Sequence, residues 1–177
     1  MPSGKTHDAV TFLLTVPALA LTYAATMNFA ASLTVTAAFL FGGLMFGPDL
    51  DTFSKQYSRW SIFRLLWYPY RSFFKHRSRW SHGLVFGTFL RVVYFMGVLT
   101  VAAFLSVLVV AAYLRAETPN PVDFAEAWSS LGNFVRANLG DQFLPAVFFG
   151  TWVGAASHTF TDIAGSYVKT GRITEFL

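Results

Sequence analysis

Histidines and aspartates at a few characteristic spacings are the residues of this chain best suited to chemistry. Asp49 and Asp51 are one residue apart and follow Gly-Pro, a pattern typical of a chain turn. His158 and Asp162 are four positions apart, so in a helix they share one face. Imidazole and carboxylate groups bind divalent metals. The candidate metal ligands are His7, Asp49, Asp51, His76, His82, His158 and Asp162.

Because the chain has no cysteine, a thiolate site is excluded, and the ligand set suits Zn first, with Mn, Fe or Ni as alternatives. The candidates are numerous enough for one or two ions. Such a centre activates water and binds a phosphoryl or carbonyl oxygen. Asp8, Arg77 and Arg79 are the candidate catalytic residues, the two arginines as partners for an anionic substrate. Solvated cytoplasmic charge is the competing interpretation of these arginines. For Asp49 and Asp51 the competing interpretation is a helix cap with solvated charge.

The composition favours lipid as the solvent. Of the 177 residues, 54% are hydrophobic and 12% are charged, whereas a soluble domain has about 25% charged residues. Most Lys and Arg residues fall between Lys55 and Arg91, a concentration typical of a cytoplasmic loop between membrane spans. The basic and aromatic residues of this region could also bind nucleic acid, but the apolar flanks favour a membrane surface.

The pattern predicts an all-α membrane protein, a single integral domain with four transmembrane helices. The expected spans are 9–26, 29–46, 86–114 and 143–168. A cytoplasmic interfacial helix is expected over 53–67, with Pro69 ending it, because aromatic residues recur there at helical spacing. A short helix starting at Asn120-Pro121 is expected in the outer loop.

Topology supplies a test of whether the candidate residues meet. If the basic loop is cytoplasmic, both termini are cytoplasmic and all four histidines come to the inner face, together with their neighbouring aspartates. His158 lies 15 positions into the fourth span, roughly 22 Å deep at about 1.5 Å per residue. Spaced glycines are expected to let the helices approach closely at a similar depth. These are the pairs Gly43/Gly47, Gly83/Gly87 and Gly150/Gly154.

The chain resembles the YdjM-like membrane-bound metal-dependent hydrolases, and still more a related bacterial group of metal-binding membrane proteins. The resemblance rests on His7, Pro48-Asp49-x-Asp51, His76-Arg77-x-x-x-Ser81-His82 and His158-x-x-x-Asp162. It covers nearly the whole chain, and it implies a small helical inner-membrane protein with a His/Asp metal site built from these residues. YdjM-like sequences often have two residues between His-Arg and Thr/Ser-His, where this chain has three.

The sequence therefore predicts a metal-dependent hydrolase at the cytoplasmic face of a bacterial inner or internal membrane, acting on a lipid or other phosphoester. One alternative is a metal-free type 2 phosphatidic-acid phosphatase, which the segment from His158 to Gly165 resembles, although Gly-Ala-Ala-Ser replaces the expected Ser-Arg before the histidine. Another is a non-catalytic metal-binding subunit of a membrane complex, or a metal transport or sensing element. The expected partners are the lipid bilayer, the substrate and other membrane proteins, and no nucleic acid is expected.

Overall fold

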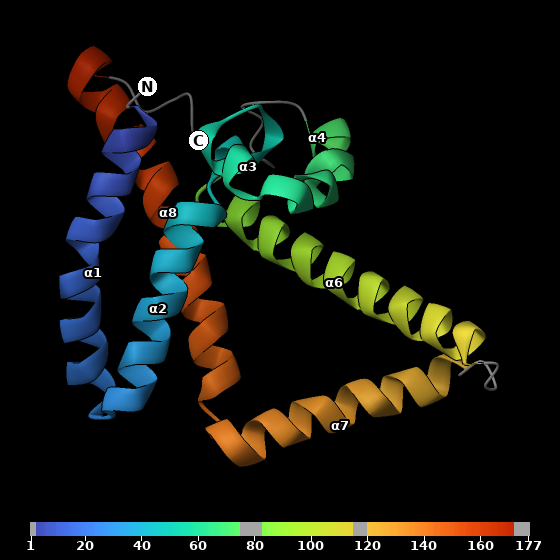
Figure 1. The fold of residues 1–177 in the computed structure, drawn as a ribbon. Coiled ribbons are helices and arrows are strands. Elements are labelled where there is room, and N and C mark those ends of the chain that lie inside the picture. The colour runs from blue at the N-terminus through green and yellow to red at the C-terminus, as the bar shows by residue number, and fades with distance from the viewer. Residues whose placement is uncertain (1–2, 75–82, 115–119, 172–177) are drawn as a thin grey trace.

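The computed structural model describes residues 3–74, 83–114 and 120–171, and all regular structure within these ranges is helical. The all-α prediction is thus confirmed. In Figure 1 three long helices lie side by side, a fourth slants away from their upper end, and a fifth crosses between the far ends. The three adjacent helices are α1 (Gly4–Thr26), α2 (Phe29–Met45) and α8 (Phe143–Thr170), the slanting one is α6 (Phe86–Tyr113) and the crossing one is α7 (Pro121–Leu139).

The chain reverses between α1 and α2 through local capping. The Ser3 hydroxyl accepts a hydrogen bond from the Thr6 amide and starts α1. Met27, with φ of 49°, ends α1 in the left-handed region, and the Asn28 side chain then accepts from the Ala31 amide to start α2. This tight reversal makes α1 and α2 antiparallel, so the end of α2 returns to the level where α1 begins.

Glycines bring the α2 and α8 backbones into contact. A Cβ atom at Gly154 would lie 2.0 Å from the Phe39 carbonyl oxygen, and one at Gly42 would lie 2.2 Å from the Thr151 carbonyl oxygen. Neither position has room for a side chain, so the small residues set the interhelical distance. A Cβ atom at the neighbouring Gly43 would instead meet Thr11 of α1. Gly42 thus allows α2 to contact α8, and Gly43 allows α2 to contact α1.

Apolar side chains cover the outside of the three-helix bundle, and polar side chains lie within it. Leu13, Val16 and Leu21 of α1 are each at least 70% exposed, whereas His7 and Thr11 on the same helix are buried. Two helices, α1 and α6, are long and apolar enough to cross a membrane by length and composition. The apolar helix α2 is shorter, at 17 residues.

The segment 53–67, expected to form one interfacial helix, is instead two short pieces, and a third short helix follows it directly. These are α3 (Lys55–Arg59), the 3-10 helix η2 (Ser61–Trp67) and α4 (Tyr68–Phe73). The break falls at Ser61, whose φ is 48°, and Pro69 lies in the first turn of α4 rather than ending a helix. The prediction of a single helix ending at Pro69 was therefore wrong.

Aromatic packing explains the break. Trp60 and Trp67 turn inward and lie edge-on against Phe46 at the end of α2, with ring centroids 5.6 and 5.5 Å away. Phe53 and Phe63 of the same expected stripe remain 84% and 62% exposed. Some of these aromatic residues therefore belong to the core. Their contacts hold the segment of α3 and η2 against the end of α2.

The helix after Asn120 begins as the sequence predicts. The Asn120 side chain accepts from the amides of Val122 and Asp123, and Asp123 accepts from the Asn120 amide, which completes a capping box. At 19 residues α7 is longer than the short helix expected. It contacts the start of α8 and has no buried residue.

We expect Gly154→Ala to destabilise the protein, because its methyl group would overlap the α2 backbone. Overpacking of this kind costs about 1–3 kcal/mol. Gly97→Ala on α6 is the matched control, since a Cβ atom there meets nothing within 4 Å. Thermal unfolding in detergent measures both variants. Equal melting temperatures for the two would contradict the α2–α8 contact.

Candidate metal centre

The ends of three elements bring candidate ligands together. His7 lies in the first turn of α1, and His158 and Asp162 lie one turn apart on the second half of α8. Asp49 lies on η1 (Pro48–Asp51), the 3-10 turn that follows α2. Because Gly154 holds α8 against α2, the turn of α8 that carries His158 lies beside the chain as it leaves α2.

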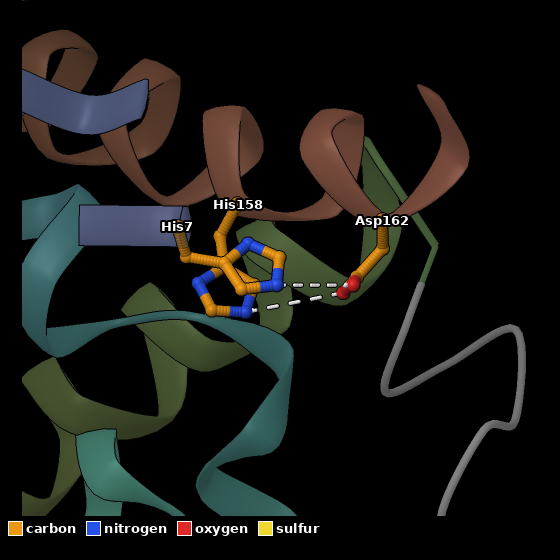
Figure 2. A group of neighbouring side chains, drawn as sticks. All are labelled: His7, His158 and Asp162. Carbon is orange, nitrogen blue, oxygen red and sulfur yellow. Dashed lines mark ion pairs between the residues drawn. The ribbon is translucent and has the colours of Figure 1, made fainter. Parts of the chain in front are cut away.

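Two imidazoles and one carboxylate form the centre of the cluster, which we call the His/Asp centre. Figure 2 shows the rings of His7 and His158 overlapping, with Asp162 facing both. The rings are stacked, with centroids 3.7 Å apart and planes 4° from parallel. His7 Nε2 lies 3.2 Å from Asp162 Oδ1, and His158 Nε2 lies 3.9 Å from Asp162 Oδ2. The three residues are 3%, 2% and 1% exposed.

The separations match those of ligands around one ion. One ligand atom from each of the three residues lies within 4.8 Å of the others. With metal–ligand bonds of about 2.0–2.1 Å, the ligand atoms of a tetrahedral site lie roughly 3.3 Å apart. The 3.2 Å from Asp162 Oδ1 to His7 Nε2 is of this size, the 3.9 Å from Asp162 Oδ2 to His158 Nε2 is longer, and the two parallel rings would have to tilt for both nitrogens to face one ion. Neutral imidazole is the form that ligates a metal ion.

Hydrogen bonding inside the centre also fits a metal. Both Asp162 carboxylate oxygens and His158 Nε2 are buried without a hydrogen-bond partner among the described residues. A buried carboxylate is costly unless a cation or hydrogen bonds balance it, and the ion-pair partners described for Asp162 are the two histidines. A divalent cation held by His7, His158 and Asp162 would supply the missing charge and use the unpaired atoms.

The two aspartates of the Asp-x-Asp turn take different positions. Asp49 Oδ2 lies 3.7 Å from His158 Nε2, and its side chain is 26% exposed, so it can complete the centre from the solvent side. Asp51 is buried and does not belong to the convergent group of three. The Asp51 charge acts instead on Arg91, a fully buried residue of α6. Arg91 lies against Tyr70 of α4, and burial raises the pKa of the Tyr70 phenol. Asp51 as a direct ligand stays a prediction.

Asp8 points into a cationic pair. Its carboxylate accepts from Lys55 Nζ and, at 2.6 Å, from an Arg59 guanidinium nitrogen. Arg59 also donates to the Leu44 carbonyl oxygen at 2.8 Å, which ties the pair to the end of α2. The structure therefore gives Asp8 the role of holding two cations beside the His/Asp centre.

Gln56 supports the far side of the His158 ring. Its Nε2 donates to the Gly43 carbonyl oxygen at 3.1 Å and lies 2.9 Å from His158 Nδ1. When the ring ligates through Nε2, Nδ1 carries the proton and needs an acceptor. Gln56 Oε1, buried without a hydrogen-bond partner among the described residues, becomes that acceptor if the amide exchanges its two ends, an exchange that gives up the bond from Nε2 to the Gly43 carbonyl oxygen. A Cβ atom at Gly47 would lie 2.1 Å from this oxygen, so glycine makes room for the amide.

Four of the sequence-predicted residues lie outside the described part of the chain. They are the candidate ligands His76 and His82 and the candidate catalytic residues Arg77 and Arg79. Sequence reasoning missed Gln56, which carries no motif signal. It also placed Lys55 and Arg59 at the lipid interface, although their i, i+4 spacing could have shown that they share one helix face.

The described part of the chain is helical and holds a buried His/Asp group that could bind a metal ion, which fits a metal-binding class of protein. Its family is described as "Uncharacterized metal-binding protein (DUF2227)", and the chain belongs to that family, whose model matches residues 2–172. The chain is also similar to an "Uncharacterized protein" of Aquifex aeolicus (strain VF5), with 33% identity over 132 residues that cover 74% of this chain and 89% of the relative. No solved structure matches the chain. Metal binding is what the family description supports, and it names no hydrolase activity.

We expect Gln56→Ala to weaken metal binding by about 10–100-fold, because the variant removes the partner that orients His158. Gln56→Glu should restore most of the affinity, since its carboxylate accepts from Nδ1–H. Competition against a chromophoric chelator gives the dissociation constants. An alanine variant with wild-type affinity would show that Gln56 does not act through His158.

Proposed function

We propose that this protein is a membrane-embedded, metal-dependent hydrolase whose His/Asp centre opens to the cytoplasmic face. The observation that supports it is the convergence of His7, His158 and Asp162 around one point, with the partly exposed Asp49 facing solvent. A closed structural site has no side open to a substrate, whereas this centre borders a pocket lined by Asp49 and His158. Zn is the ion we expect first, with Mn, Fe or Ni as alternatives and a second ion possible near the cytoplasmic loop.

The residues divide the work between binding and positioning. A divalent ion held by His7, His158 and Asp162 would supply Lewis-acid chemistry, activating water and polarising an ester oxygen. Stacking and Gln56 keep the His158 ring in place. Asp49 reaches both the centre and the pocket, so it can hold a water proton on the solvent side.

Membrane embedding is part of the same proposal. Exposed apolar side chains on α1 and α6 and polar side chains buried among the helices are the distribution expected when lipid surrounds the protein. With the basic segment of α3, η2 and α4 cytoplasmic, α1, α2, α6 and α8 would be the four spans of a bacterial inner-membrane protein, and both termini would be cytoplasmic. The substrate is then a lipid or another phosphoester at that surface.

The arrangement favours a metal mechanism over a phosphohistidine mechanism. In the phosphatase alternative His158 would attack a phosphoryl group directly. Its Nε2 instead faces the carboxylates of Asp49 and Asp162, whose negative charges would repel that group. A cation between the nitrogen and the carboxylates removes this conflict.

The test is turnover by protein purified in detergent from the membrane fraction. We expect hydrolysis of p-nitrophenyl phosphate or phosphatidic acid that depends on bound divalent metal and falls to the background rate in His158→Ala. Asp141→Asn, an exposed aspartate before α8, is the control and should keep wild-type activity.

Stoichiometric metal without turnover on any phosphoester would contradict the hydrolase proposal. It would favour the alternative function, a non-catalytic metal-binding subunit of a membrane complex. Turnover that persists after metal removal would instead favour the metal-free phosphatase.

A further inference from the structure

A small polar pocket lies directly beside the His/Asp centre. It has a volume of about 100 Å³ and is lined on one side by Asp49 and His158 and on the other by Lys55 and Arg59. No motif in the sequence marks it, because its walls come from α1, η1, α3 and α8. The pocket is therefore a product of the fold, and its cations come from a segment that sequence reasoning placed against lipid.

We propose that this pocket binds the phosphoryl group of the substrate, with Lys55 and Arg59 as the residues that bind its oxygens. This inference rests on the proposed function for the role of the metal, but the cation pair can be tested apart from it. The ligand chemistry is that of a phosphate monoester, from either a lipid headgroup or a soluble molecule.

Charge supports an anion in this position. Asp8 neutralises one of the two cations, and a divalent ion held by His7, His158 and Asp162 would offset Asp49, the other carboxylate of the lining, so the metal-loaded pocket carries a net positive charge. Lys55 has three donors and Arg59 five, and the hydrogen bonds to Asp8 and Leu44 use only some of them. The remaining donors are available to an oxyanion.

Asp8 also fixes where the cations stand. Lys55 is half-exposed and would otherwise move freely, but it shares the Asp8 carboxylate with Arg59, one turn further along α3. Asp8 in turn follows His7 in the chain, so one turn of α1 supplies both a metal ligand and the anchor of the cation pair. This linkage sets the distance between the metal and the proposed anion site.

Size limits what the pocket can hold. With a volume of about 100 Å³ and polar walls, the pocket suits a small polar group such as a tetrahedral oxyanion.

The test is equilibrium binding of inorganic phosphate to detergent-purified full-length protein, measured by calorimetry with and without added Zn²⁺. We expect Zn²⁺ to strengthen phosphate binding, because it offsets the Asp49 charge, and Lys55→Gln to weaken binding to the Zn²⁺ form about tenfold, because it removes a charge-assisted hydrogen bond. Arg64→Gln is the matched control, an exposed arginine of the same basic segment that does not line the pocket, and it should bind as wild type does.

Wild-type affinity in Lys55→Gln, or equal weakening in Arg64→Gln, would overturn the inference, the latter because it indicates diffuse charge. A wild-type protein that binds no metal but shows the Lys55 effect would retain the anion site and remove the proposed hydrolase. Displacement of phosphate by dihexanoyl phosphatidic acid at lower concentration than by glycerol phosphate identifies a lipid headgroup. Equal displacement identifies a soluble phosphate monoester.

Discussion

The buried carboxylate of Asp162 is the constraint on which the rest of the structure depends. It lies 1% exposed among helices whose outer surfaces are apolar, and its described ion-pair partners are His7 and His158. An uncompensated charge in such a place costs several kcal/mol. A divalent cation would balance this charge and would bind His158 Nε2, which has no hydrogen-bond partner among the described residues.

Close packing of α2 against α8 and α1 brings the residues of this centre together. Gly42 and Gly154 let α2 and α8 touch through their backbones, and Gly43 admits Thr11 of α1. Without these contacts the first turn of α1 and the second half of α8 could not meet. In lipid, where apolar surface gives no drive to associate, close packing between small residues is one of the interactions that hold helices together, and these glycine contacts are of that kind.

Much of this arrangement could be predicted from the sequence, because hydrophobic runs and charge asymmetry are strong signals. They gave the all-α class and the positions of α2, α6 and α8, and the i, i+4 pair His158/Asp162 indicated one helix face. The division of Asp49 from Asp51 and the part played by Gln56 could not be predicted, since both depend on side-chain directions in a 3-10 turn and a five-residue helix. The broken interfacial helix was missed because Trp60 and Trp67 pack on Phe46, a tertiary contact that overrides helical periodicity.

The most direct test of the central claim is X-ray absorption at the edge of the bound metal in the purified protein. The structure predicts a first shell of nitrogen and oxygen at about 2.0–2.2 Å and outer-shell scattering from imidazole rings that decreases in His7→Ala and in His158→Ala. No retained metal, or a bound metal whose imidazole scattering is the same in both variants as in the wild type, would contradict a centre built on these two histidines.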